Sequence, residues 1–548
     1  MKLRFLLALC TSAHLVAGEA QDLHLTYPSV AEGGEQPYRL FVPSAYDGQH
    51  ALPLIIAMHG TGGNENTLFD EYDNGAPKRA AEKAGVLLVS PRGALVSEYR
   101  GVGEYDVLAV LEEVRRRYRV DESRIYLTGH SMGGTGSAYL ALHHPDVFAA
   151  AASLAAAYSF PWLARNARSV PTLWIGGAED NEAYLRGVMP GIDRMLKFGA
   201  KPIFELLPGQ GHKGPVQDFY RVFAWQLKQQ RDLHPKAYTF DVDTPLQGRG
   251  FWTTVERLAT PGRIACVEAE AVADDTARFA LRNVAAFAFA PDPIVFDRQQ
   301  PIGVTIDGAE CWRGLIPEKN ELALRSEAGK WFATSRPQVS HPLAEWRAHP
   351  VAEAPESLDM LGTEKRLANW ITDAMRAATG ADIALYSAVY YRGLPIPQGT
   401  VDIVDVIQCT RPFDQSLVTV QLTGRNLEDI LRANLAALES YPHLAVDRPG
   451  SGRVIQVSGL HYIFDSGKPP AERLISTDLD PARTYSVAFE GQVMERQTIL
   501  LGGRFKQLDY RTTDTPLSMA LYAHAAGSGR IEAKAEGRVR DLHDGAAR

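Results

Sequence analysis

Short apolar runs alternate with helical patterns over the first part of the chain. The runs at residues 54–58 and 86–89 are typical of strands buried on both faces of a sheet. Between residues 107 and 118, apolar side chains recur on one helical face. Further strand-like runs follow at residues 124–128, 172–175 and 203–207. This alternation predicts an α/β fold with a doubly wound, mostly parallel sheet over residues 22–231.

The pattern changes near residue 234. Alternating apolar and polar positions, clearest at residues 302–306, predict a small β-sandwich over residues 235–338. Proline, alanine and charged residues then predict a linker over residues 341–357. Residues 358–538 combine a helical stripe, closed by Gly380, with later strand-like runs, which predicts an α+β domain. We expect the tail after residue 538 to be disordered.

The first twenty residues differ from the rest. Lys2 and Arg4 precede an apolar run, and small residues at positions 17, 18 and 20 offer cleavage sites. We interpret residues 1–20 as a signal peptide and expect a secreted or periplasmic protein, although a short disordered N-terminus is the alternative. Elsewhere no run reaches the roughly 18 apolar residues that cross a membrane, so we expect no membrane span.

Composition narrows the classes of partner and cofactor. A chain of 548 residues with 45% hydrophobic residues is typical of a globular protein with several domains. The net charge of −8 gives no reason to expect nucleic acid or an anionic membrane as a partner. We find no motif for a metal or a dinucleotide, so no cofactor is implied. The oligomeric state stays open.

The four cysteines do not form a recognisable metal or redox motif. Cys10 would leave with the signal peptide, and the sequence contains no C-x-x-C. Cys266 and Cys311 lie in the same β-rich region and could pair in an exported protein. Because a third cysteine, Cys409, also remains, buried free thiols are an equal alternative.

The strongest chemical signal is the G-x-S-x-G pattern at residues 129–133. A predicted strand precedes it, and a helical segment ending before Pro145 follows it. A serine on a tight strand-to-helix turn exposes its hydroxyl beside free backbone N–H groups. We therefore predict that Ser131 is a nucleophile; the alternative is an ordinary serine in a glycine-rich turn.

A serine nucleophile needs a base and an acid that orients the base. Asp180 follows one predicted strand and His212 the next, so both would lie at the carboxyl edge of the sheet. The order Ser, Asp, His is that of doubly wound hydrolases. A solvated loop carboxylate is the alternative for Asp180. We expect His143 and His144, at the end of a helix, to be surface residues.

Two backbone donors must also face the developing oxyanion. We predict one at Met132, directly after the nucleophile, and the other at Thr61, in the glycine-rich segment 59–63. The alternative for that segment is a phosphate-binding loop, but no Lys-Ser or Lys-Thr pair follows it.

These motifs resemble those of secreted esterases with the α/β-hydrolase fold, including polyhydroxybutyrate depolymerase-like, feruloyl esterase-like and acetylxylan esterase-like proteins. The resemblance covers about 200 residues, through the segments 59–63, 129–134 and 144–150 and the Asp180 and His212 loops. It implies an esterase that acts on a small-molecule or polymeric ester, with catalytic roles for Ser131, Asp180 and His212.

The last region resembles the C-terminal domain of 5′-nucleotidases, through the segments 367–375, 381–385, 411–413, 420–424 and 456–460. That resemblance implies a nucleoside-binding role for Arg392 and Phe413. However, the family's Asn-Gly-Gly is replaced by residues 387–389, and the metallophosphatase half is absent. We therefore expect a degenerate accessory domain. The alternatives are a nucleoside-binding or nucleotide-binding protein and a 5′-nucleotidase-related hydrolase.

Overall fold

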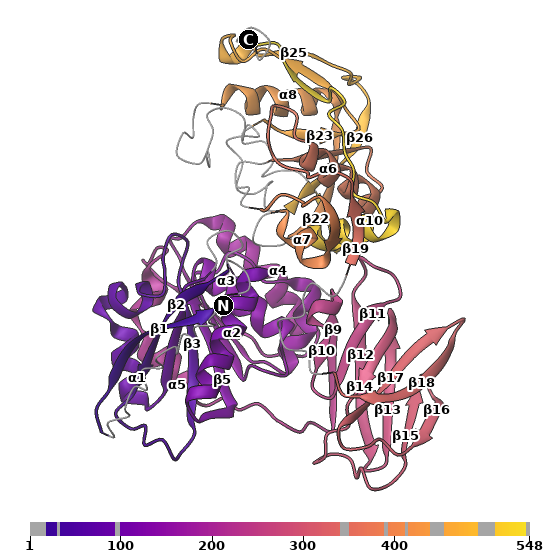
Figure 1. Ribbon diagram of the computed structural model, residues 1–548. Coiled ribbons are helices and arrows are strands. Elements are labelled where there is room, and N and C mark those ends of the chain that lie inside the picture. The colour runs from indigo at the N-terminus through magenta and orange to yellow at the C-terminus, as the bar shows by residue number, and fades with distance from the viewer. Residues whose placement is uncertain are drawn as a thin grey trace, which may run out of the picture.

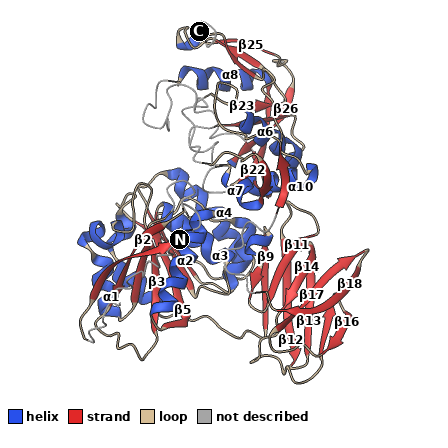
Figure 2. Cartoon of the chain, in the orientation of Figure 1, coloured by secondary structure: helices blue, strands red, loops and turns tan. Residues whose placement is uncertain are grey.

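The computed structural model describes residues 18–29, 33–93, 99–339, 350–387, 393–410, 415–438, 454–491 and 510–543. The chain runs through three regions in sequence order. The first combines helices with a large sheet, the second consists of strands, and the third again mixes helices and strands (Figures 1 and 2).

The first region is built on an eight-stranded sheet with the strand order β1-β2-β4-β3-β5-β6-β7-β8. From β4 through β8 neighbouring strands are parallel, whereas β2 pairs antiparallel with both β1 and β4. The strands are β1 (Gln21–Pro28), β2 (Glu35–Val42), β3 (Leu52–Met58), β4 (Leu87–Pro91), β5 (Val120–His130), β6 (Ala150–Leu154), β7 (Thr172–Gly177) and β8 (Ile203–Leu207). The predicted doubly wound, mostly parallel sheet is confirmed, with an antiparallel edge at its start.

Helices cover both faces of this sheet, and the side chains of β3 show why. Leu54 and Ile56 enter one apolar cluster with residues of α2 and α3, while Ile55 enters another with residues of α1 and α5. A strand presents successive side chains to opposite faces, so an uninterrupted apolar run fills two cores. The helices are α1 (Ala76–Ala84), α2 (Val102–Arg117), α3 (Met132–His143), α4 (Glu182–Lys197) and α5 (Phe219–Gln226).

The second region forms two five-stranded sheets, ordered β10-β11-β14-β17-β18 and β16-β15-β13-β12-β9. Both sheets contribute to one apolar cluster, in which Trp252 meets Phe279, Phe289 and Phe296 edge-on. The strands are β9 (Ala237–Val242), β10 (Arg249–Gly250), β11 (Thr253–Leu258), β12 (Ala265–Ala273), β13 (Thr276–Arg282), β14 (Val284–Phe289), β15 (Ile302–Ile306), β16 (Ala309–Gly314), β17 (Asn320–Glu327) and β18 (Lys330–Pro337).

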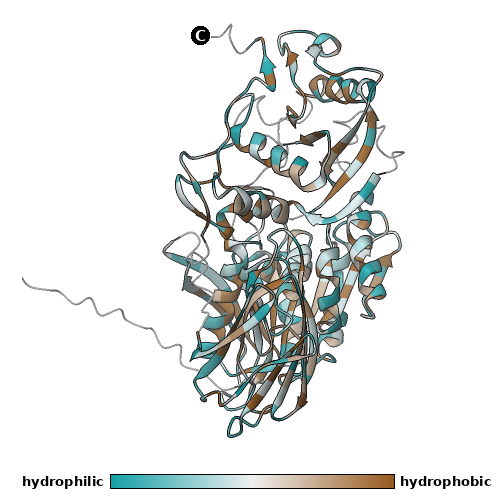
Figure 3. Cartoon of the chain, turned by 90° about the vertical axis from the view of Figure 1, so that its right-hand side faces the viewer, coloured by the Kyte–Doolittle hydropathy of each residue, from teal (hydrophilic) through white to brown (hydrophobic). Residues whose placement is uncertain are grey.

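The third region contains three sheets, β19-β21, β23-β20-β26-β22-β27 and β25-β24-β28. Its helices carry both apolar and polar residues (Figure 3), and α6 and α10 extend the apolar cluster of the second region. Its helices are α6 (Arg366–Thr379), α7 (Ile403–Gln408), α8 (Gly424–Ala436) and α10 (Leu517–Ser528). Its strands are β19 (Pro350–Ala354), β20 (Ile383–Tyr386), β21 (Gly399–Asp402), β22 (Ser416–Thr423), β23 (Gln456–Ser458), β24 (Tyr462–Phe464), β25 (Leu474–Thr477), β26 (Thr484–Glu490), β27 (Tyr510–Pro516) and β28 (Val539–Asp541).

Two boundary predictions need correction. The expected linker 341–357 contains β19, which pairs with β21 and buries Ala352 and Ala354 in the common core. The expected disordered tail begins with β28, which pairs with β24 and buries Val539. Both strands are short, and each pairs with a strand distant in sequence, β21 for β19 and β24 for β28. Residues 340–349 and 544–548 lie outside the described residues.

His143 and His144 are not surface residues, because the second region covers the end of α3. The His143 Nε2 atom lies 3.1 Å from Asp243 Oδ2, just after β9, and the His144 Nε2 atom lies 2.5 Å from Glu104 Oε1. All four side chains are buried. Buried polar groups are tolerated when they are paired in this way. The His143–Asp243 contact joins the first two regions, and the His144–Glu104 contact lies within the first.

The described cysteines are unpaired. Cys266 and Cys409 are buried, Cys311 is half-buried, and all three are free thiols. Burial raises the pKa of Cys266 to about 12. No helix in the described part of the chain is long and apolar enough to cross a membrane.

Candidate active site

Ser131 lies on the sharp turn between β5 and α3. Its φ of 55° and ψ of −114° are unusual for a residue with a side chain. The Ser131 backbone N–H donates to the carbonyl oxygen of Leu154 at 2.8 Å, which ties the turn to the end of β6. The predicted strand–turn–helix around Ser131 is therefore present, with the serine in the conformation that a nucleophile elbow requires.

Three glycines allow this turn to pack. A Cβ atom added at Gly129 would lie 2.3 Å from the carbonyl oxygen of Gly133, and one at Gly133 would lie 2.1 Å from that of Met58. A Cβ at Gly134 would lie 2.5 Å from the carbonyl oxygen of Leu154. Because Cβ atoms essentially never approach backbone oxygen so closely, each position requires glycine.

Asp180 and His212 lie in two loops that contact each other through their backbones. Asp180 follows β7, and His212 lies between β8 and the short 3₁₀ helix η4 (Gly214–Gln217). The Glu179 N–H donates to the carbonyl oxygen of Gln210 at 2.9 Å. A Cβ at Gly177 would lie 2.3 Å from that same oxygen, so glycine is needed where the loops meet. Two segments about 30 residues apart are thus held in register.

The structure brings the three predicted residues together. The His212 Nδ1 atom lies 2.7 Å from Asp180 Oδ2, and the His212 Nε2 atom lies 2.9 Å from Ser131 Oγ. Since a carboxylate only accepts, Nδ1–H donates to Asp180, which leaves Nε2 to accept the Ser131 proton. The Asp180 side chain is 5% exposed and that of His212 is 35% exposed, so the acid is shielded while the base remains accessible.

A second histidine supports the His212 loop. The His130 Nε2–H group donates to the carbonyl oxygen of His212 at 2.9 Å, so Nδ1 of the neutral ring accepts from the Tyr72 hydroxyl at 2.8 Å. The His212 ring lies between those of His130 and Tyr184, with centroid distances of 4.9 and 5.3 Å. Burial lowers the pKa of His130 to about 4, so this ring is neutral at pH 7.

The glycine-rich segment 59–63, which is predicted to supply an oxyanion donor at Thr61 and is called the oxyanion segment below, lies beside Ser131. A Cβ at Gly60 would lie 3.4 Å from Ser131 Cβ, which places the backbone leading into Thr61 next to the serine. Burial raises the pKa of Tyr72, whose hydroxyl would lie 3.4 Å from a Cβ at Gly60. Met132 is the first residue of α3, where backbone N–H groups have no partner within the helix.

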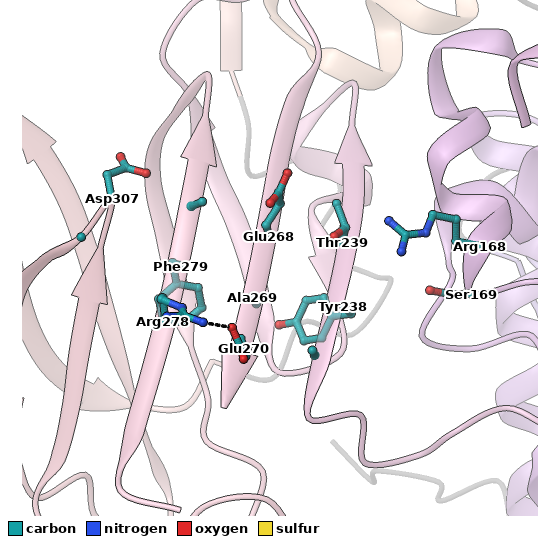
Figure 4. Close-up of a pocket in the computed structure, with 13 residues that line it drawn as sticks. Arg168, Ser169, Tyr238, Thr239, Glu268, Ala269, Glu270, Arg278, Phe279 and Asp307 are labelled. Carbon is teal, nitrogen blue, oxygen red and sulfur yellow. Dashed lines mark hydrogen bonds and ion pairs between the residues drawn. The ribbon is translucent and has the colours of Figure 1, made fainter. Parts of the chain in front are cut away.

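A separate cavity of about 640 Å³ lies between the first and second regions (Figure 4). Arg168 and Ser169 face the strands β9, β12 and β13 across it, and Arg278 pairs with Glu270 on the sheet side. Because its lining includes neither Ser131 nor His212, this cavity takes no part in the arrangement described above.

The residues predicted to bind a ligand in the third region, Arg392 and Phe413, lie outside the described residues. In the part of the chain that the structure describes, no group of three or more His, Cys, Asp or Glu side chains is placed to hold a metal ion.

Sequence reasoning missed the residues that surround His212, which are His130, Tyr72 and Tyr184. His130 could have been identified from the sequence by its position directly before Ser131. Tyr72 lies 58 residues before its partner His130, and Tyr184 lies on α4, so only the folded chain brings these rings to His212.

Comparisons with known proteins find similarity to two different families in two separate segments of the chain. Residues 29–188 match the family model described as "Putative esterase", and residues 350–495 match that of the 5′-nucleotidase C-terminal domain. "Putative esterase NocK" from Nocardia uniformis subsp. tsuyamanensis is 33% identical over 164 residues, which are 28% of this chain and 47% of that protein. Feruloyl esterase B from Talaromyces funiculosus is 29% identical over 130 residues, which are 22% of this chain and 35% of that protein.

The chain therefore spans less than half the length of these two relatives. Among solved structures, a 5′-nucleotidase precursor from Thermus thermophilus aligns with a TM-score of 0.32 and 21% identity, over 44% of this chain and 54% of that chain. The two family matches do not overlap, and they fall on the first and third regions. The chain thus combines a segment similar to the esterase family with a segment similar to the 5′-nucleotidase C-terminal domain.

Proposed function

We propose that the chain is a serine carboxylic-ester hydrolase in which Ser131 is the nucleophile, His212 the general base and Asp180 the acid that orients the base. The observation that carries the proposal is the continuous hydrogen-bonded arrangement of Asp180, His212 and Ser131, at 2.7 and 2.9 Å. Its order along the chain, Ser then Asp then His, is that of α/β-hydrolase enzymes.

In the first step, Ser131 Oγ attacks the ester carbonyl carbon and its proton passes to His212 Nε2. The new imidazolium is stabilised by Asp180, whose carboxylate is shielded from water. Collapse of the tetrahedral intermediate breaks the bond to the alcohol, which leaves with the proton from His212. The acyl group stays on Ser131 as an ester.

In the second step, a water molecule gives a proton to His212 and attacks the acyl-enzyme. Collapse of the second tetrahedral intermediate releases the carboxylic acid, and Ser131 recovers its proton from His212. Because the His212 side chain is 35% exposed, water can reach the ring. Every proton removed in one step is returned in the next, so no cofactor is required.

The N–H groups of Met132 and Thr61 would hold the oxyanion in both intermediates. The Ser131 N–H is already engaged by the carbonyl oxygen of Leu154, whereas Met132 begins α3 and Thr61 follows the Gly60 backbone beside Ser131, so these two amides are the candidates for this role. Donors fixed before the reaction begins stabilise developing charge without reorganisation.

We propose that the substrate is a small-molecule or polymeric carboxylic ester. The name of one relative, feruloyl esterase B, makes aromatic acyl groups the first class to test. We also propose that residues 1–20 direct export, and that the two sheets of residues 237–337 form a β-sandwich that serves as an accessory domain.

Hydrolysis of a panel of esters tests this function. Acetyl, butyryl, feruloyl and hydroxybutyrate esters should reveal at least one substrate for the wild-type protein, and Ser131→Ala should lose at least about 10³-fold in kcat. A Ser131→Ala variant as active as the wild type would contradict the assignment. Ser123→Ala is the matched control, since Ser123 lies at the start of β5, away from the triad.

A second candidate function is nucleoside binding by the third region, favoured by the family match over residues 350–495. Calorimetric titration with adenosine and with AMP tests it. Saturable heat with either ligand would agree with this function, and no heat with both would contradict it.

A further inference from the structure

Arg100, in the esterase segment, is buried against the third region. It is 3% exposed and directly precedes Gly101 and α2. The Arg100 Nη2 atom donates to the carbonyl oxygen of Ile407 at 2.7 Å and to Thr410 Oγ1 at 3.1 Å. Ile407 lies in the last turn of α7, where carbonyl groups lack partners within the helix, so the guanidinium supplies one. Charged donors form the stronger class of hydrogen bond, so this contact fixes α7 on the esterase segment.

The next residue meets the same helix. Gly101 has φ of +58°, and a Cβ there would lie 2.8 Å from Cγ of Gln408. Gln408 is itself buried. The backbone at Gly101 therefore lies directly against a side chain of the third region. This close packing is independent of the Arg100 hydrogen bonds and shows that the two regions are in intimate contact at this point.

The preceding residue faces the catalytic centre. Tyr99 is fully buried, and its hydroxyl donates to the carbonyl oxygen of His59 at 3.4 Å. Its ring lies edge-on to the His59 ring at 5.7 Å. A Cβ at Gly136, on α3, would lie 2.8 Å from Tyr99 Cβ. Tyr99 is therefore packed between the start of the oxyanion segment and the helix that begins after Ser131.

His59 is in turn the residue from which the oxyanion segment starts. Both nitrogens of its ring face carbonyl oxygens, that of Gly60 at 2.8 Å and that of Arg92 at 2.5 Å. The contacts with Tyr99, Gly60 and Arg92 leave the ring little freedom. A shift of Tyr99 would therefore be transmitted to the backbone that leads into Thr61.

We propose that docking of the third region on Arg100 positions the oxyanion segment of the esterase. This inference rests on the proposed ester hydrolysis. Arg100 is a positioning residue, which acts through Tyr99 and His59 and touches no reacting atom. Backbone donors stabilise the transition state when they are held in place, and a displacement of about 1 Å can cost on the order of 100-fold in rate. The nucleotidase-like segment thus contributes to ester hydrolysis without binding the ester.

A second contact between the same two regions provides a matched control. Arg194, on α4, pairs with Asp514, on β27, and their side chains are 35% and 71% exposed. This exposed pair joins the esterase segment to the third region without contacting Tyr99 or His59 in any described interaction. Its removal changes the contact between the regions but leaves the path to the oxyanion segment intact.

Steady-state kinetics on p-nitrophenyl acetate test the proposal in the full-length protein. Arg100→Met and Thr410→Val should each lower kcat, the first by about tenfold, because the oxyanion donors act on the transition state. KM should change less than twofold. Affinity for a trifluoromethyl ketone, which forms a tetrahedral adduct with serine, should fall in parallel. Arg194→Met should keep the kcat and the ketone affinity of the wild type.

The thermal midpoint of each variant shows whether it has a folding defect. If Arg100→Met fails to fold, Thr410→Val carries the test, because valine has nearly the volume of threonine. Wild-type kcat for both Arg100→Met and Thr410→Val, or for a folded Thr410→Val alone if the other variant fails, would overturn the proposal. An equal loss in Arg194→Met would also overturn it, since any weakening of docking would then suffice. A wild-type protein that hydrolyses no ester would instead contradict the proposed function.

Discussion

Replacing His130 with glutamine should make the esterase segment less sensitive to acid. In the wild type, the buried His130 ring has a pKa of about 4, against a usual value of 6.5. Its Nε2–H group donates to the His212 backbone, and its Nδ1 accepts from Tyr72. Glutamine retains a donor at the length of Nε2 but does not titrate. Comparing the two proteins therefore isolates the cost of a buried neutral histidine at low pH.

The magnitude follows from proton linkage. In the unfolded chain His130 binds a proton below about pH 6.5, whereas in the folded protein it does so only below about pH 4. Protonation therefore favours the unfolded chain across this window, and stability falls as the pH drops. A difference of about 2.5 pKa units at about 1.4 kcal/mol each gives on the order of 3 kcal/mol between pH 7 and pH 4.

Urea unfolding at pH 7 and pH 4, followed by circular dichroism, measures this effect. The wild type should lose about 3 kcal/mol more free energy of unfolding than His130→Gln over that interval. Other titrating groups are common to both proteins and cancel in the comparison. Equal acid sensitivity of the two proteins would refute the reasoning, as would a His130 signal titrating near pH 6.5 in histidine-labelled NMR spectra.

Two further predictions concern packing and a buried ion pair. Gly133→Ala should cost at least about 4 kcal/mol, because its Cβ would lie 2.1 Å from the carbonyl oxygen of Met58; Gly211→Ala, with open space at its Cβ, should keep the wild-type thermal midpoint. Burial opposes the charge of His143, but the Asp243 carboxylate raises the pKa of His143. The stabilisation of the fold by this ion pair is present at low pH and is lost as the pH rises through the raised pKa. Asp243→Asn should therefore lower the thermal midpoint more at pH 6 than at pH 9, and an effect independent of pH would contradict this assignment.

The proximity of Ser131, Asp180 and His212 could be predicted from the sequence because each follows a strand of the same sheet. The carboxyl ends of parallel strands meet at one edge, so Ser131, Asp180 and His212 had to lie near one another once their strands were recognised. The glycines at positions 129 and 133 marked the turn, and the structure shows that backbone oxygen fills the space where their side chains would be. Local pattern and shared topology together were sufficient for this part of the site.

Where the sequence misled, contacts distant along the chain were decisive. His143 ends a helix, which is typical of a surface residue, but the second region brings Asp243 against it from 100 residues away. Val539 lies in a polar tail and is ordered by pairing with Tyr462 of β24. Arg100 belongs to no motif, and its partners Ile407 and Thr410 lie more than 300 residues further along the chain. Such contacts leave no periodic pattern in a single sequence.

The third region packs closely against both of the other regions. It shares an apolar cluster with the second region and meets the esterase segment at Arg100, next to the oxyanion segment. A fusion whose parts fold independently would leave that surface of the esterase in water. The buried state of Arg100 instead indicates that the esterase segment is completed by its neighbour.

The most direct test of the central claim is the identification of the residue that a fluorophosphonate modifies. Peptide mass spectrometry of the labelled wild-type protein should show a single adduct, on the peptide that carries Ser131. His212→Asn should label at least about 100-fold more slowly, because the serine would lose its base, and Ser131→Ala should not label at all. An adduct on any other residue of a protein that hydrolyses esters, or undiminished hydrolysis by Ser131→Ala, would contradict the account.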